Sequence, residues 1–394
     1  MKTTNSERIY ALDALRAIMM LLGIVLHAGI TYASFDYTAF WPVKDPDNHI
    51  GFDIMVSIIH FFRMPVFFVV SGYFAALLFY KKGPQKMIMN RIKRILLPLI
   101  ASVITVYPMA VFAYAYTKAA FGGALFPLIM AWNEILSGQF LYFQLLHLWF
   151  LYFLIFYAVG GWLIARIFDK DTALTTTANK VFTFILQNFW LRILGFTFLF
   201  FLCLLWIGEP SLTTNNKWSI DPPIFMTYFL FFLTGWVIFK TNSLDKLKAY
   251  PIWQLSLSII LFFAFILIPW PDSQTGLHVR EFLSALFGTL FIFGFIALFM
   301  SYFNKYSSKL SYMMDAAYWV YIIHLPIVAF IPGLMAGLAM PVFLKFLITL
   351  SFTTTICFVS YHLLVRNTFI GMFLNGKMQK KMTIPQVNQA FTET

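Results

Sequence analysis

The stretch FDIMVSIIHFFRMPVFFVVSGYFAALLF, residues 52–79, decides the fold class of this chain. It is longer than the ~20 residues that an α-helix needs to cross the hydrocarbon core of a bilayer, and Asp53 and Arg63 are its only charged residues. The whole chain of 394 residues has this character, because 60% of its residues are hydrophobic and 11% are charged. A soluble domain would carry about 25% charged residues. The sequence therefore predicts one polytopic, all-α membrane bundle and excludes a typical soluble enzyme.

Nine more stretches have the length and composition of membrane spans. They are continuously apolar rather than alternating, which argues against a membrane β-barrel. The ten predicted spans are 11–32, 52–79, 95–117, 146–165, 191–208, 222–239, 251–270, 282–303, 316–336 and 341–364. The first is interpreted as a retained helix and not as a cleaved signal peptide, because it is long enough to span and lacks a small-residue cleavage site.

The distribution of Lys and Arg predicts the orientation of these spans. If the N-terminus is cytoplasmic, 21 of the 28 basic residues lie in inner segments, four lie in outer loops and three lie within spans. Basic residues collect on the cytoplasmic side of membrane proteins. We therefore expect both termini to be cytoplasmic, with a membrane domain over 1–376 and a tail over 377–394. Topology also accounts for the net charge of +12, so we do not expect a nucleic-acid partner.

Two polar residues share one face of the first span. Arg16 and His27 are eleven residues apart, which on a helix is ~20° in azimuth and ~16 Å along the axis. That face would present a cation near the cytoplasm and an imidazole nearer the outside. It suits a phosphate-bearing donor from within and a hydroxyl acceptor from outside. The alternative is a snorkelling arginine and a histidine that is hydrogen-bonded for structural reasons.

The second span carries His60 and Arg63 on one narrow stripe. His60 lies ~12 Å below the outer end of its helix and His27 lies ~9 Å below that of the first. We therefore predict that the first two helices are neighbours and that His27, His60 and Arg63 line one cavity. The alternative is an arginine satisfied by backbone carbonyls at a turn distorted by Pro65. Gly72, after Ser71, is interpreted as a site of close helix packing.

The remaining polar candidates are individually weaker. Arg91 and Arg94 stand at the predicted cytoplasmic entry of the third span, where they suit either phosphate recognition or simple topology. His147 and His324 each suit a structural role better when taken alone. No P-loop, dinucleotide fingerprint or H-E-x-x-H motif occurs, and no histidine–carboxylate spacing predicts a metal site.

Taken together, these motifs resemble the membrane-bound acyltransferase 3 family over most of the chain. The stretches that carry the resemblance are Leu12–Arg16 with His27, 62–74, 91–98, 147–151 and 321–326. The stretches 59–63 and 373–377 resemble especially the glucans biosynthesis protein C branch of that family.

The resemblance implies O-acylation of cell-surface carbohydrates at a bacterial inner membrane, and the branch implies succinylation of periplasmic glucans. Acyl-CoA would be the donor substrate, without a tightly bound cofactor. His27 would be the general base, with Arg63 or His60 stabilising the oxyanion. An acyl-His27 intermediate is the mechanistic alternative. Arg16, Arg91 and Arg94 would hold the CoA phosphates, with His324 assigned to the same donor site. A transporter of a glucan precursor or small anion is the competing class.

Overall fold

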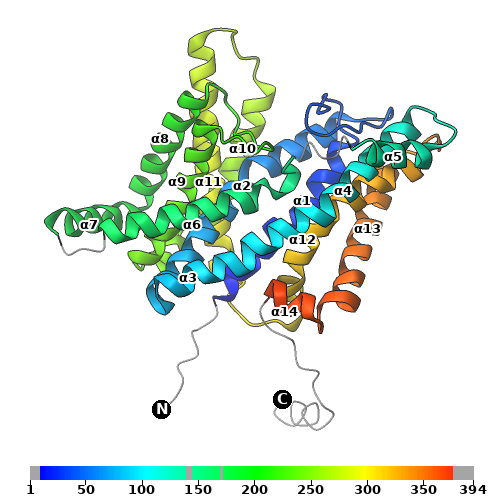
Figure 1. The fold of residues 1–394 in the computed structure, drawn as a ribbon. Coiled ribbons are helices and arrows are strands. Elements are labelled where there is room, and N and C mark those ends of the chain that lie inside the picture. The colour runs from blue at the N-terminus through cyan, green and yellow to red at the C-terminus, as the bar shows by residue number, and fades with distance from the viewer. Residues whose placement is uncertain (1–8, 139–143, 169–171, 376–394) are drawn as a thin grey trace, which may run out of the picture.

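The computed structural model describes residues 9–138, 144–168 and 172–375. These residues form a bundle of α-helices with short 3₁₀ and π segments, and no β-strand occurs among them. The prediction of an all-α polytopic fold is confirmed (Figure 1). The expected tail over 377–394 lies outside the described residues.

Nine helices in the described ranges are long and apolar enough to cross a membrane. Each coincides with a predicted span. They are α1 (Tyr10–Ile30), α2 (Ile50–Lys82), the continuous α3–η1–α4 rod (Pro84–Arg91, Ile92–Leu96 and Leu97–Phe121), η3–α6 (Leu146–Leu148 and Trp149–Phe168), α8 (Phe189–Ile207), α9 (Pro222–Lys240), α11 (Gln274–Tyr302), α12 (Ser308–Leu334) and α13–η5 (Val342–Ser360 and Tyr361–Val365).

The tenth predicted span is a shorter helix. Its counterpart α10 (Pro251–Leu267) has 17 residues, about 26 Å of helix against a hydrocarbon core of ~30 Å. Pro269 and Pro271 follow directly, and the lack of a backbone N–H in proline explains why the helix stops before residue 270. Four further helical segments lie outside the predicted spans: α5 (Pro127–Leu136), α7 (Ala173–Gln187), η4 (Leu244–Lys248) and α14 (Phe369–Asn375).

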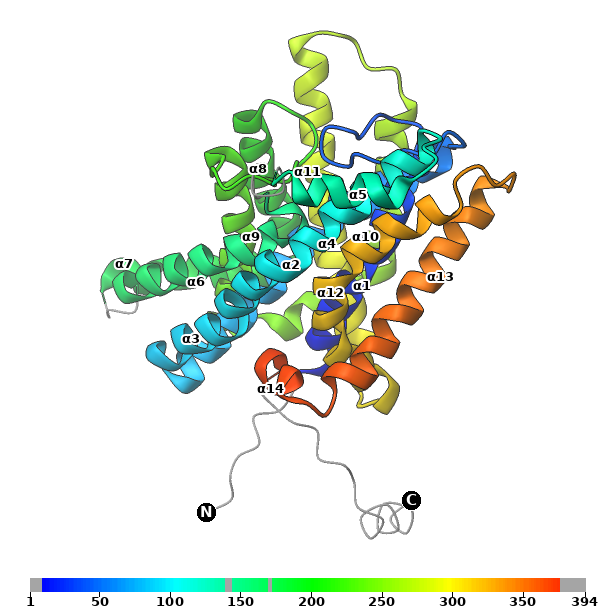
Figure 2. The ribbon, with the colours of Figure 1, turned by 45° about the vertical axis from the view of Figure 1, so that its right-hand side comes forward.

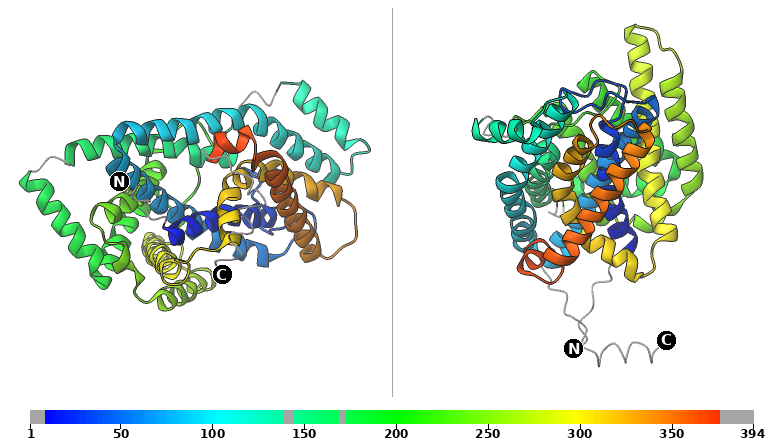
Figure 3. Two further views of the ribbon diagram at one scale, coloured as in Figure 1. Left: turned by 90° about the horizontal axis from the view of Figure 1, so that it is seen from below. Right: turned by 90° about the vertical axis from the view of Figure 1, so that its right-hand side faces the viewer.

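The first helix lies inside the bundle. It packs against α2, α11, α12 and α13, and the view from below shows α11 on one side of it and α12 and α13 on the other (Figure 3). On the far side of α2, α9 makes a long contact with α2. Helix α12 in turn packs against α4 and α13. The core that holds the predicted site residues is therefore built mainly from α1, α2 and α12.

Glycine decides the closest of these helix contacts. A Cβ atom on Gly72 of α2 would overlap the carbonyl oxygen of Phe232 in α9, and one on Gly235 of α9 would overlap that of Val69 in α2. Only a residue without a side chain allows the two backbones to touch. The interpretation of Gly72 as a packing residue is confirmed.

The two described ends of the chain lie at one end of the bundle. The first turn of α1 and the helix α14 both lie at the lower end of the bundle (Figures 1 and 2). Both ends lie on one side if the shorter α10 crosses along with the nine longer helices, because ten is an even number. The assignment of that end to the cytoplasm stays a prediction.

Candidate active site

Two histidines from opposite ends of the sequence form a hydrogen-bonded pair. Nδ1 of His27 on α1 lies 2.9 Å from Nε2 of His324 on α12. Nδ1 of His324 lies 2.8 Å from the carbonyl oxygen of Tyr321 and 3.1 Å from that of Val320. A carbonyl oxygen can only accept, so Nδ1 of His324 carries a proton, and Nε2 of a neutral His324 is an acceptor.

This pairing fixes the tautomer of His27. Since Nε2 of His324 accepts, Nδ1 of His27 is the donor, and Nε2 of a neutral His27 is left with a free lone pair. Within the described residues the only hydrogen bond of the His27 ring is the one to His324, and His27 lines a cavity. The arrangement presents a base to the cavity in the tautomer that proton abstraction requires.

Trp41 covers one face of the His27 ring. The two rings are stacked, with centroids 5.3 Å apart and planes 10° from parallel. The indole N–H donates to Oγ1 of Thr31 over 3.0 Å. An indole face attracts a cation, so the stack would stabilise an imidazolium formed at His27.

The loop 31–49 that carries Trp41 is fastened to α13 by a buried ion pair. Nζ of Lys345 lies 3.2 Å from Oδ1 of Asp45 and 2.8 Å from Oδ2 of Asp47. Lys345 and Asp45 are 3% and 1% exposed. The hydroxyls of Tyr32 and Thr349 make a second link over 2.8 Å. Lys345 was one of the three basic residues counted within spans, and sequence reasoning missed both its partner and Trp41.

Proline explains how α12 holds a third histidine. Pro326 has no backbone N–H, so it leaves the carbonyl of Ile322, four residues earlier, without its helical partner. Nε2 of His147 lies 3.1 Å from that oxygen and donates to it. The hydroxyl of Tyr321 donates to the carbonyl of His147 over 2.5 Å. Nδ1 of His147 is buried without a hydrogen-bond partner among the described residues.

Arg63 on α2 reaches toward α1 at a glycine. A Cβ atom on Gly23 would stand 2.6 Å from Nη1 of Arg63 and 3.6 Å from Nε2 of His324, so the guanidinium occupies space that any larger residue would take. Its Nε is buried with no hydrogen-bond partner in the described ranges. Such a charge within a membrane bundle is expensive and marks a functional site.

His60, one turn from Arg63, faces a different partner. Its Nε2 donates to the carbonyl oxygen of Leu212 over 2.7 Å. This bond ties α2 to the segment 208–221 between α8 and α9. Nδ1 of a neutral His60 is then an acceptor, so His60 cannot donate to a developing oxyanion unless it is protonated.

These groups surround one cavity of about 510 Å³. The prediction that the first two helices are neighbours, with His27, His60 and Arg63 in one cavity, is confirmed. The lining side chains that carry a polar atom are His27, Tyr37, Trp41, Ser57, His60, Arg63, Tyr114, His147, Trp149, Glu209, Ser211, Thr213, Thr214, Asn216, Tyr321 and His324. His324, predicted to belong with the donor-binding arginines, lies against His27 instead.

The arginines near the start of α1 form a separate group. Nη2 of Arg16 lies 2.8 Å from Oδ1 of Asp13, one turn earlier on α1. Arg91 is close enough to Arg16 for their like charges to interact, and its Nη2 is buried without a hydrogen-bond partner in the described part of the chain. Arg94 donates to the carbonyl of Leu374 in α14 over 3.1 Å. The cavity extends to Met20, one turn from Arg16.

The chain is similar to known proteins over most of its length. The model of the acyltransferase domain family matches residues 9–362. Glucans biosynthesis protein C of Escherichia coli K12 is 25% identical over 392 residues, which covers 96% of this chain and 97% of that protein. Glucans biosynthesis protein C of Shigella dysenteriae serotype 1 is similar to the same extent. No solved structure matches the chain.

Proposed function

The chain belongs to the acyltransferase 3 family and is a membrane acyltransferase, and we propose that it moves a succinyl or acetyl group from cytoplasmic acyl-CoA to a carbohydrate hydroxyl. The acceptor would be a periplasmic or cell-surface glycan, with an osmoregulated glucan as the first candidate. The observation that carries the proposal is the His27–His324 pair, which leaves Nε2 of His27 without a partner in the cavity that Arg63 also lines.

The transfer begins with a proton. Nε2 of His27 takes the proton of the acceptor hydroxyl while that oxygen attacks the thioester carbon. His27 becomes an imidazolium, whose Nδ1–H stays bonded to His324 and whose face lies against Trp41. A positioned general base of this kind contributes ~10²–10⁴-fold to the rate.

The second half of the reaction releases the CoA thiol and completes the ester. The tetrahedral intermediate carries its negative charge on the former carbonyl oxygen, and Arg63 is the group that would stabilise it. The C–S bond then breaks as the new C–O ester is completed, and the CoA sulfur takes the proton from His27. We assign the oxyanion to Arg63 over His60 because the Nε2–H of His60 is already bonded to Leu212.

The donor would enter from the end of the bundle that holds Arg16, Arg91 and Arg94. Guanidinium groups bind phosphate oxygens through charge-assisted hydrogen bonds, and the unpaired Nη2 of Arg91 is free for one. The ~16 Å along α1 between Arg16 and His27 would be covered by the thin pantetheine arm, past Met20, while the charged nucleotide stays at the cytoplasmic end.

Radiolabelled acyl transfer tests the proposal against a transporter. The purified protein is reconstituted in liposomes that enclose a glucan acceptor, and labelled succinyl-CoA or acetyl-CoA is added outside. We expect covalent label on the enclosed glucan. The control is His362→Ala. It removes an exposed imidazole that does not line the cavity, and it should retain transfer. Movement of unmodified glucan or free anion, without covalent label, would instead establish a transporter.

A further inference from the structure

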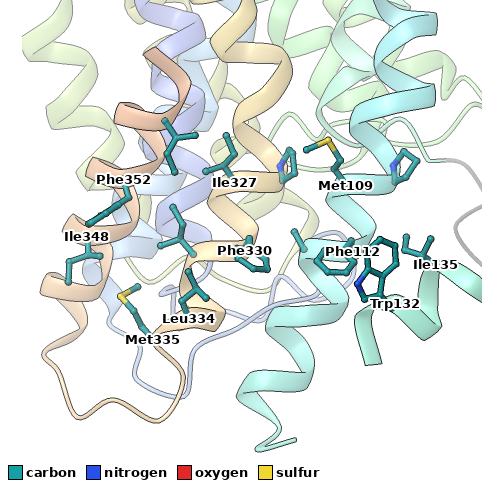
Figure 4. Close-up of a pocket in the computed structure, with 15 residues that line it drawn as sticks. Met109, Phe112, Trp132, Ile135, Ile327, Phe330, Leu334, Met335, Ile348 and Phe352 are labelled. Carbon is teal, nitrogen blue, oxygen red and sulfur yellow. The ribbon is translucent and has the colours of Figure 1, made fainter. Parts of the chain in front are cut away.

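A second hollow lies on the opposite side of α12 from the histidines. It is a groove of about 670 Å³ between α4, α5, α12 and α13. In Figure 4, Met109 and Phe112 of α4 face Ile327 and Phe330 of α12, while Ile348 and Phe352 of α13 and Trp132 of α5 close the sides. We call it the apolar groove. Its full lining is Pro108, Met109, Phe112, Ala113, Trp132, Ile135, Pro326, Ile327, Phe330, Ile331, Leu334, Met335, Ile348, Phe352 and Ile356.

The chemistry of the apolar groove restricts its occupant. All of the lining side chains are apolar, and the indole N–H of Trp132 is their only hydrogen-bond donor. Its volume falls within the ~300–1,000 Å³ that is usual for small-molecule sites. A carbohydrate or a CoA phosphate would find no partner there, so the groove cannot be a second site for either substrate of the proposed reaction.

Its position and length restrict the occupant further. Helices α4, α12 and α13 all belong to candidate membrane spans, so the groove opens onto lipid. From Pro326 to Met335 it extends ~14 Å along α12, about half of the ~30 Å hydrocarbon core. A partner helix crossing the bilayer would need the whole thickness, whereas one acyl chain occupies one leaflet.

We propose that the apolar groove binds one acyl chain of a bilayer phospholipid. The chain would run along α12 within a single leaflet, between the aromatic side chains of Phe112 and Phe330 and the apolar side chains of α13. This binding site does not depend on the proposed acyl transfer.

The bound chain would also support the active site. Leu325 lines the polar cavity and Pro326 lines the apolar groove, so a single turn of α12 separates the two. On α4, Tyr114 lines the polar cavity and its neighbour Ala113 lines the apolar groove. This turn of α12 carries His324 and the carbonyl that binds His147. An acyl chain packed behind it would fill the hollow that otherwise lies beside these groups.

Photo-labelling with a phospholipid tests the proposal. The protein is placed in nanodiscs with a phosphatidylethanolamine that carries a diazirine near the end of one acyl chain, and labelled residues are mapped by mass spectrometry. We expect labelling of α12 and α13 groove residues above that of lipid-facing positions on α6, such as Leu163, which is 50% exposed. Labelling of the groove at the level of such positions would overturn the proposal.

Two variants that fill the apolar groove sharpen the test. Ile348→Trp and Met109→Trp add bulk from α13 and α4, and Met109 is 56% exposed, so at least this change leaves the packed core intact. Each should reduce groove labelling to the level of other lipid-facing positions. The matched control is Leu347→Trp, one residue away, which is 54% exposed and outside the lining. Unchanged labelling in both filled variants, with each verified as folded by its elution volume and melting curve, would also overturn the proposal.

Discussion

Replacement of His324 by alanine is the most informative perturbation of the proposed mechanism. The structure gives His324 one function toward the chemistry, which is to accept the Nδ1–H of His27 over 2.9 Å. In the reaction that bond becomes charge-assisted, because His27 gains a proton. Hydrogen bonds to charged groups contribute about 1.5–3 kcal/mol, which corresponds to ~10–150-fold in rate at ~1.4 kcal/mol per tenfold.

We therefore expect His324→Ala to lower acyl transfer by ~10–150-fold, with donor binding unchanged. His324→Gln should lose less, because its side-chain carbonyl can still accept from His27. The assay is single-turnover transfer of labelled acyl groups from acyl-CoA, alongside donor binding by calorimetry. His362→Ala serves as the control for the loss of an imidazole as such.

The double variant of His27 and His324 tests whether His324 acts through His27. If His324 acts only through His27, then His27→Ala combined with His324→Ala should be no slower than His27→Ala alone, because residues that act as a unit are not additive. Multiplicative loss in the double variant would refute the pairing as the origin of the effect. So would a normal transfer rate in His324→Ala.

Three further predictions concern the surroundings of the pair. Arg16→Ala should weaken acyl-CoA binding, measured by calorimetry, because it removes a cation from the proposed phosphate site; unchanged affinity would reduce Arg16 to a structural charge. Lys345→Met should destabilise the fold by about 3–5 kcal/mol, because it leaves a buried carboxylate unpaired; the combined change with Asp45→Leu should recover much of this loss in melting experiments. Cysteines introduced in segment 81–94 should react with an impermeant maleimide only in inverted vesicles, and reaction in intact cells would reverse the predicted topology.

Most of the fold could be predicted from the sequence because its long helices coincide with continuous apolar stretches. All ten predicted spans correspond to helices, and the difference at α10 follows from Pro269 and Pro271. Helices α5 and α7 could not be predicted in this way, because neither is long enough to cross a membrane. They have 10 and 15 residues.

The part of the site that depends on positions along a single helix could be predicted from the sequence. The spacing of Arg16 and His27, and the depths of His27, His60 and Arg63, depend only on the rise and twist of a helix. The bond between His27 and His324 joins residues 297 positions apart, and no periodicity specifies which helices become neighbours. Trp41 was missed for a related reason, since it lies in a loop whose position depends on the Lys345–Asp45 ion pair.

Two signals in the sequence could have indicated more. A lysine within a span requires a counter-charge, so Lys345 indicates a nearby carboxylate. Pro326 frees the carbonyl four residues before it, which made Ile322 an expected acceptor. Neither signal identifies its partner, since Asp45 and His147 lie on other elements.

The central claim is that Nε2 of His27 is the base for acyl transfer, and paired measurements on His27→Ala test it most directly. Calorimetry gives the affinity for acyl-CoA, and single-turnover transfer gives the rate of the chemical step in the same preparation. We predict unchanged affinity with transfer reduced by ~10²–10⁴-fold. Near-normal transfer by the folded His27→Ala protein would contradict the account.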